Sequence, residues 1–388
     1  MQQRSKTSNI RMIAIDMDGT LLGDDGQVSP RNVAALAAAQ AAGTEVVIAT
    51  GRRHSYAMRV LRPLGLAHAA VLISSNGTVT RTVGSFGSDA IPSRLIAHTH
   101  IPVSTALWLC GHLRGLGDMD FRNALVLTFD RVGPDGDDAC GALVVEDLEE
   151  LNDSIGRWMT SNAPYIARIN PIERALEPLA ADVSPSDLQA TDTSHHAPIQ
   201  AMLCGTIERM ARAEARLLER PGVQASDQPT GRSGRTTLGT ASVKATPSQT
   251  PANISTHKVS EAPSTTASSS WVESENSADY IPILTLHRTV YPARNLSILD
   301  ILPPNCSKGA ALLKIAASRN IDPAEILAVG DNWNDVSMFE LAGQSVLMAN
   351  APEDLRMLAH TRNWRIGLAN TADGVAEAIE SALMVLCR

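Results

Sequence analysis

The chain has 388 residues, of which 44% are hydrophobic and 3% aromatic, and it carries a formal net charge of −8 at pH 7. This length exceeds one ordinary domain, and the apolar content suffices for sizeable cores built mainly from aliphatic side chains. The acidic balance argues against a nucleic-acid-binding protein, because the phosphate backbone requires a basic face. Any affinity for phosphate must therefore come from a few residues at one site and not from an extended basic surface.

The cysteines and the amino terminus give no sign of an exported or membrane protein. Five scattered cysteines without C-x-x-C spacing indicate neither a disulfide framework nor a zinc site. The first twelve residues lack the apolar segment of a signal peptide, and no run of about 18 apolar residues occurs anywhere. We therefore expect a cytoplasmic protein with no membrane partner, while its oligomeric state stays open.

The first predicted strand delivers two carboxylates into a turn. Ile13–Ile15 is a β-branched apolar run, and Asp16 and Asp18 follow it before a Gly-Thr pair. Side chains at positions i and i+2 of an extended segment point the same way, so both carboxylates can face one ligand. This spacing suits phosphoryl transfer, with Asp16 as nucleophile and Asp18 as general acid and base. Taken alone, the five residues from Asp16 to Thr20 also fit the end of an ordinary strand followed by an Asp-Gly turn.

The next elements alternate between helix and strand. Ser29 and Pro30 are typical of a helix start, and Arg31–Ala42 is an alanine-rich helical run. Glu45–Ala49 is a strand that ends at Thr50 and Gly51, whose hydroxyl and backbone N–H can bind a phosphoryl oxygen. A simple turn explains this pair equally well. A helix at 55–64 and a strand at 69–74 complete this block.

Residues 84–297 form a second body of mixed α/β pattern. Helical patterns occupy 104–112 and 206–219, and strand patterns occupy 125–129, 142–145 and 281–287. Within this body, residues 221–278 are rich in Ser, Thr and Pro and hold one aromatic residue, so they cannot bury enough apolar surface to offset their ordering entropy. We expect a disordered insertion there, with a partner-binding segment as the alternative.

The last block supplies a lysine and further carboxylates. Ser307, Lys308 and Gly309 open a helix over 310–317, where a lysine can neutralise charge on a transferring phosphoryl group. The predicted strand 326–329 is followed by Gly330 and Asp331, and Asn334 and Asp335 lie about one helical turn further along the chain. The alternative for Lys308 is a solvated surface lysine, and the alternative for the run from Asp331 to Asp335 is a simple helix cap. Helices at 336–341 and 373–386 and a strand at 345–348 complete the pattern.

The order of these motifs resembles the haloacid dehalogenase superfamily. The motifs are D-x-D-G-T, T-G-R, S-K-G and G-D-x-x-N-D, and all four occur in this order. Residues 74–77, 299–309 and 346–351 more narrowly resemble the Cof-type hydrolases, which carry an α/β cap. The resemblance covers residues 10–80 and 296–380 well and the middle only loosely.

The resemblance implies a role for each motif residue. Asp16 would be the nucleophile and a Mg²⁺ ligand, and Asp18 the acid/base, with its carbonyl on the metal. Asp331 would be the third metal ligand. The position of Asp335, one turn on, lets it touch phosphate or orient the residues around the metal. The phosphate-binding positions would be Met17, Thr50, Gly51, Lys308 and Asn334.

These observations predict an α/β protein with a doubly wound, Rossmann-like parallel sheet. Its core would comprise 1–83 and 298–388, with an α/β cap at 84–297. We expect a Mg²⁺-dependent phosphatase that hydrolyses a small phosphorylated metabolite, with sugar phosphates as the leading class, through an aspartyl-phosphate. A phosphotransferase or phosphomutase is the nearest alternative. A non-catalytic binding protein is a further one, which the intact set of Asp16, Asp18, Lys308 and Asp331 argues against.

Overall fold

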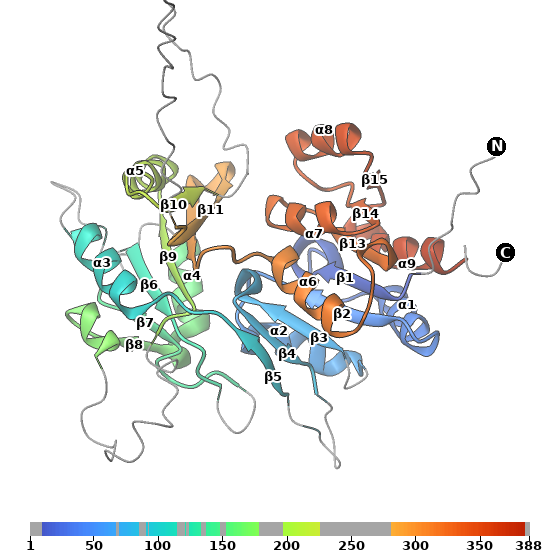
Figure 1. The fold of residues 1–388 in the computed structure, drawn as a ribbon, viewed down its shortest axis with the longest axis horizontal. Helices are drawn as coiled ribbons and strands as arrows, with labels where there is room; N and C mark the ends of the chain where they lie inside the picture. The colour runs from blue at the N-terminus through green and yellow to red at the C-terminus, as the bar shows by residue number, and fades with distance from the viewer. Residues whose placement is uncertain are drawn as a thin grey trace, which may run out of the picture. The chain divides into compact units, whose positions relative to one another are not determined.

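The computed structural model contains two β-sheets. It describes residues 10–66, 70–84, 91, 93–114, 121, 124–132, 137–147, 153–177, 197–225 and 281–384. Within these residues, the first sheet has eight strands in the order β15-β14-β13-β1-β2-β3-β4-β5, and the second has seven in the order β10-β11-β12-β9-β6-β7-β8 (Figure 1).

The first sheet and its helices come from both ends of the chain. Its strands are β1 (Met12–Asp16), β2 (Glu45–Ala49), β3 (Val71–Ser74), β4 (Val79–Thr82), β5 (Leu95–His98), β13 (Ile326–Gly330), β14 (Gln344–Leu347) and β15 (Arg365–Ile366). Its helices are α1 (Pro30–Ala41), α2 (His54–Leu61), α6 (Lys308–Ser318), α7 (Val336–Leu341), α8 (Glu353–Arg362) and α9 (Gly374–Met384).

Strand β1 lies where the order of the parallel strands reverses. It pairs in parallel with β13 on one side and with β2 on the other, and β3, β14 and β15 extend the parallel part. The α1, α2 and α9 helices pack on one face and the α6, α7 and α8 helices on the other. This is the predicted doubly wound architecture, in which ligands bind beyond the carboxyl ends of the strands at the reversal point.

Local signals explain several helix boundaries. Ser29 accepts a hydrogen bond from the N–H of Asn32 at 3.1 Å, and Pro30 is the first residue of α1. Ser307 caps α6 in the same way, through the N–H of Ala310 at 3.1 Å. The capping side chains therefore fix where α1 and α6 begin, as predicted.

The second sheet is built from the middle of the chain. Its strands are β6 (Leu125–Thr128), β7 (Leu143–Val145), β8 (Ile166–Arg168), β9 (Gln200–Gly205), β10 (Val223–Ala225), β11 (Leu284–Tyr291) and β12 (Leu296–Leu302). Helices α3 (Val103–Arg114) and α5 (Ile207–Leu217) pack with the sheet around one apolar core, and α4 (Asp153–Asn162) packs around another. The predicted mixed α/β character of this segment is confirmed.

Three details differ from the predicted division of the chain. Strand β5 lies beyond residue 83 but pairs antiparallel with β4 in the first sheet. Residues 298–302 belong to β12, which pairs with β9 and β11 in the second sheet. Val223–Ala225 falls within the predicted disordered insertion yet forms β10, because its residues pair with β11 and Val223 is buried in the core. Residues 226–278 of the insertion lie outside the described residues, and the extent of a cap domain stays a prediction.

Two sequence expectations concern the chain as a whole. Cys110, Cys140, Cys204 and Cys306, the cysteines that the structure describes, form no disulfide. Among the helices of the described ranges, none combines the length and apolar character needed to cross a membrane.

Candidate active site

Two neighbouring parallel strands bring distant carboxylates together. Asp16 is the last residue of β1, and Asp331 directly follows β13, which pairs with β1. Asp335 ends the short helical turn after Asp331. Carboxylate oxygens of the three residues lie within 4.8 Å of one another. The predicted meeting of the first and last motifs at one edge of the sheet is therefore present.

Lys308 lies buried among these carboxylates. Its ammonium donates to Asp16 Oδ1 at 2.5 Å and to Asp335 Oδ1 at 2.7 Å, and its side chain has no exposed surface. Burial alone would lower the pKa of Lys308, but Asp16 and Asp335 raise it above its usual value. The lysine is therefore a fixed positive charge, and the alternative of a solvated lysine at a helix start is wrong.

The turn after β1 fits closely against Asp331. Gly19 has a φ of +76°, and a Cβ there would lie 2.3 Å from Asp331 Oδ2. Thr20 is buried and donates its hydroxyl to Asp331 Oδ1 at 3.1 Å. Gly19 is therefore favoured both by its backbone conformation and by the close approach of the Asp331 carboxylate, and Thr20 holds that carboxylate by a hydrogen bond.

The cluster holds more negative than positive charge. Three carboxylates surround one ammonium, which leaves an excess of two negative charges when all are ionised. Burial and the carboxylate of Asp335 raise the pKa of Asp331 to about 7, and the same causes raise the pKa of Asp16. A divalent cation with a preference for oxygen ligands would offset this repulsion, so the donor set fits Mg²⁺.

Asp335 differs from its neighbours because its oxygens are already engaged. Besides Lys308, it accepts the backbone N–H groups of Asp331 and Asn332, each at 3.0 Å. Its carboxylate therefore holds Lys308 and the start of the Asp331 turn in place. Asp16 and Asp331 are the two members of the cluster with more free lone pairs.

Asp18 does not point into this cluster. Both of its carboxylate oxygens pair with the guanidinium of Arg52, at 2.5 and 2.6 Å, and the side chains of Asp18 and Arg52 are 39% and 37% exposed. The Arg52 guanidinium also stacks on the Tyr56 ring at 3.7 Å. The side chain of Asp18 thus lies at the solvent edge of the site, next to the T-G-R motif.

The remaining predicted positions lie along the same edge. Met17 and Thr50 are buried directly after β1 and β2, and Thr50 Oγ1 accepts the N–H of Arg52 at 3.1 Å. A Cβ on Gly51 would approach Asn76 Oδ1 to 3.0 Å. Asn334 donates to the same Asn76 oxygen at 3.3 Å. Asn76 thus connects the second and fourth motifs.

Sequence reasoning gave no role to Arg52, Asn76 or Asp300, although all three stand in the motifs that carry the resemblance. Asn76 has a left-handed backbone, with φ of +53°, and Ser75 before it has φ of +49°. The S-S-N-G run is a signal for such a turn, because Asn and Gly tolerate this conformation best.

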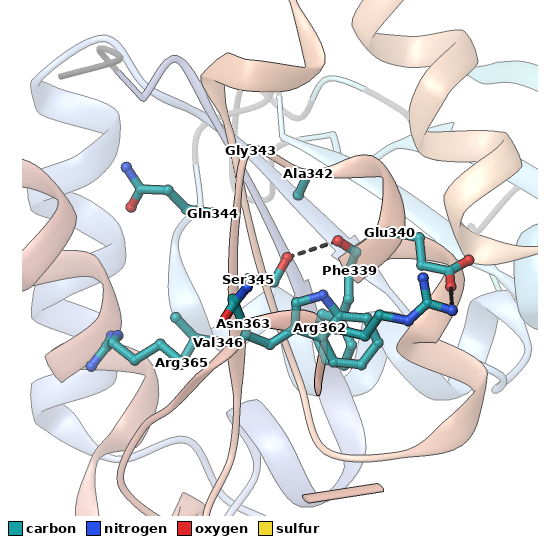
Figure 2. Close-up of a pocket in the computed structure, with 11 residues that line it drawn as sticks. Phe339, Glu340, Ala342, Gly343, Gln344, Ser345, Val346, Arg362, Asn363 and Arg365 are labelled. Carbon is teal, nitrogen blue, oxygen red and sulfur yellow. Dashed lines mark hydrogen bonds and ion pairs between the residues drawn. The ribbon is translucent and has the colours of Figure 1, made fainter. Parts of the chain in front are cut away.

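Two cavities differ in their relation to these residues. One of about 670 Å³ lies beside β14, and its Arg362 is already paired with Glu340 (Figure 2). It contains none of the predicted site residues. Another of about 420 Å³ is lined by Ser307 and Asn334, which precede Lys308 and Asp335, together with His287 and other residues. The second cavity is lined by a predicted phosphate-binding residue, Asn334, but not by Lys308 or the three carboxylates.

A family comparison agrees with this arrangement. The model of the haloacid dehalogenase-like hydrolases matches residues 13–100 and 243–379, more than half of the chain. The chain belongs to this family. The resemblance found in the motifs is thereby confirmed, and this haloacid dehalogenase-like hydrolase carries the family's four motifs at one edge of its first sheet.

Relatives of this haloacid dehalogenase-like hydrolase include proteins named as phosphatases. A phosphoglycolate phosphatase from Haloarcula marismortui is 41% identical over 93 residues, which is 22% of this chain, and the match spans only 39% of that relative. Phosphatase YwpJ from Bacillus subtilis is 28% identical over 387 residues, covering 96% of this chain and all of that protein.

A solved structure supports the fold. A haloacid dehalogenase-like hydrolase from B. subtilis superposes with a TM-score of 0.58 at 22% identity, covering 96% of this chain and 99% of the other. The similarity extends over both sheets, so the α/β fold class predicted from the sequence is confirmed.

Proposed function

We propose that this protein is a Mg²⁺-dependent phosphatase that hydrolyses a small phosphorylated metabolite, with sugar phosphates as the leading class. The observation that carries the proposal is the buried contact of Lys308 with Asp16 and Asp335 at the carboxyl end of β1. The carboxylate of Asp16 can act as a nucleophile, and the ammonium of Lys308 can stabilise negative charge. The two groups are close enough to contact the same phosphoryl group.

Asp16 is the proposed nucleophile. Its ionised carboxylate attacks phosphorus, so that a bond from Asp16 oxygen to phosphorus forms as the bond to the leaving oxygen breaks. Lys308 favours the ionised form of Asp16, because its ammonium donates directly to that carboxylate. Lys308, Met17, Thr50, Gly51 and Asn334 are the proposed contacts of the phosphoryl oxygens.

Asp18 is the proposed acid and base. It gives a proton to the leaving oxygen and then takes one from the water that hydrolyses the aspartyl-phosphate, which returns Asp16 to its free form. Because Arg52 engages both oxygens of Asp18 in the structure, this ion pair must open before Asp18 can transfer a proton. The opening costs little free energy, because the pair is exposed to water.

Asp16 and Asp331, with the backbone carbonyl of Asp18, are the residues that would hold Mg²⁺, and Asp335 would orient them. When bound, the cation would neutralise the repulsion between these carboxylates and a dianionic phosphate. We place the group esterified to phosphate in the 420 Å³ cavity, because Asn334, a proposed phosphate contact, lines it.

The test is phosphate release from a panel of sugar phosphates and aryl phosphates by the wild type and Asp16→Asn. We expect Asp16→Asn to lose about a thousandfold or more of its turnover while its thermal unfolding stays near that of the wild type. Asp18→Asn should lose more on an alkyl phosphate than on an aryl phosphate, since an activated leaving group needs less protonation. Substantial turnover by Asp16→Asn would refute the proposal.

A further inference from the structure

Four polar side chains connect the second sheet to the proposed phosphate site. On the second sheet, Gln200 Nε2 donates to Asp300 Oδ1 at 2.6 Å. Asn76 Nδ2 donates to the other oxygen of Asp300 at 3.3 Å. Asn334 Nδ2 then donates to Asn76 Oδ1 at 3.3 Å. The chain of hydrogen bonds runs without interruption from a strand residue, Asp300, to a proposed phosphate ligand, Asn334.

The backbone holds Asn76 firmly at the centre of this chain. Its N–H donates to the carbonyl of Thr50 at 3.1 Å, at the end of β2. The next residue, Gly77, has φ of +98°, and a Cβ there would lie 2.2 Å from the carbonyl oxygen of Ser307. Since the turn is clamped on both sides, Asn76 adjusts to its neighbours mainly by rotating its carboxamide.

The carboxylate of Asp300 decides which way that carboxamide faces. An ionised carboxylate only accepts hydrogen bonds, so Asn76 must present its NH₂ group to Asp300 and its oxygen to Asn334. Asn334 must then present its own NH₂ group to Asn76. Burial raises the pKa of Asp300 to about 6, so the group is still an ionised acceptor above pH 7. One charge therefore sets the orientation of two neutral amides.

The orientation of Asn334 matters for an anion. With its nitrogen toward Asn76, the carboxamide uses one N–H for Asn76 and keeps the second N–H for another acceptor. If the carboxamide of Asn334 were rotated, its oxygen would take the place of its NH₂ group, and that oxygen would repel a phosphoryl oxygen. We propose that Asp300 is a positioning residue, which acts through Asn76 to keep an N–H of Asn334 available to the phosphoryl group. This role rests on the function proposed above.

Exchanging the charge and the amide along the chain tests this role. Asp300→Asn keeps the shape but leaves one oxygen for the two donors Gln200 and Asn76. Gln200 makes the shorter contact, at 2.6 Å against 3.3 Å, so we expect it to keep that oxygen. The NH₂ group then faces Asn76, and the amides of Asn76 and Asn334 must rotate. Asn76→Asp alone places two carboxylates face to face. In the double variant, the amide introduced at position 300 would donate to the carboxylate introduced at position 76. That carboxylate would again accept from Asn334, so the original orientation of Asn334 returns.

The measurement is kcat/KM for p-nitrophenyl phosphate, with thermal unfolding of each variant. We expect Asp300→Asn to lose about 10- to 100-fold, the value of a hydrogen bond to a charged group. The double variant should be more active than either single variant, which a merely structural role of Asp300 does not predict. Asp147→Asn is the matched control, because Asp147 lies two residues after β7 of the second sheet and its side chain is 79% exposed.

The outcomes separate the two proposals. Activity of Asp300→Asn within twofold of the wild type, or a double variant no better than the weaker single variant, would overturn the positioning role alone. If Asp300→Asn does not fold, Asn76→Gly keeps the left-handed backbone and removes the amide, and wild-type activity of that variant would overturn the role equally. No phosphate release by the wild type from any ester would overturn the proposed function, and this role with it.

Discussion

Replacing Lys308 with Met should destabilise the protein in a way that depends on pH and on cations. The substitution keeps an unbranched side chain of similar length and removes an ammonium that donates to Asp16 at 2.5 Å and to Asp335 at 2.7 Å. Because Lys308 is fully buried, water cannot replace those hydrogen bonds. The carboxylates of Asp16, Asp331 and Asp335 would then face one another without a compensating charge.

The expected cost is about 3–5 kcal/mol of unfolding free energy at pH 8, the range for removing one partner from a buried ion pair. The cost should shrink as the pH falls. Carboxyl groups whose pKa is raised in the folded state bind protons more tightly there than in the unfolded chain, so lowering the pH favours folding. Asp331 already has a pKa raised to about 7, and loss of Lys308 would raise it further. At pH 5.5 we therefore expect a smaller difference from the wild type.

Urea unfolding of the wild type and Lys308→Met at pH 8 and pH 5.5, in excess chelator, measures these differences. Added Mg²⁺ should recover part of the loss, since a ligand that binds only the folded state stabilises it. Lys314→Met is the matched control, because Lys314 is exposed on the same helix. Equal stability of Lys308→Met and the wild type in chelator at pH 8 would refute the reasoning.

Two further predictions test the Gly19 turn and the buried Asp300. Gly19→Ala should lower stability by about 1–3 kcal/mol and reduce phosphate release, because its Cβ would lie 2.3 Å from Asp331 Oδ2 at a φ of +76°; unchanged thermal unfolding and activity would contradict this. Burial raises the pKa of Asp300 from 3.8 to about 6, so the wild type should lose up to about 3 kcal/mol relative to Asp300→Asn as the pH rises from 4 to 6, with little change above. Urea unfolding across that range measures this loss, and a constant difference would show that Asp300 is not buried as a charge.

The sequence predicted the first sheet and the carboxylate cluster well, for a simple physical reason. The first, second and fourth motifs stand at the ends of the apolar strands β1, β2 and β13, and parallel neighbours place their carboxyl ends at one edge whatever their separation in the chain. Asp16 and Asp331 are 315 positions apart in the numbering, but Asp16 ends β1 and Asp331 follows β13, which pairs with β1. The pairing alone brings them together.

The second sheet was predicted less completely. Its strands β8 and β10, which were not predicted, have three residues each, too few to show a reliable alternation. Strand β10 also pairs with β11 across the predicted insertion, which composition does not reveal. The Asp18 pair with Arg52 was missed as well, because two polar residues in neighbouring turns have no periodic pattern that shows their contact.

The amide chain shows where such reasoning stops. Asn76 and Asp300 are 224 residues apart. Asn76 lies in the turn between two strands of the first sheet and Asp300 in a strand of the second, so no local pattern joins them. An amide also carries no charge, and its orientation depends entirely on what it faces. Asp16, Lys308 and Asp331 have a chemistry that follows from residue type and place. The proposed role of Asn334 depends instead on the orientation of its amide. That orientation is set by Asn76 and, through Asn76, by Asp300 in a strand of the second sheet.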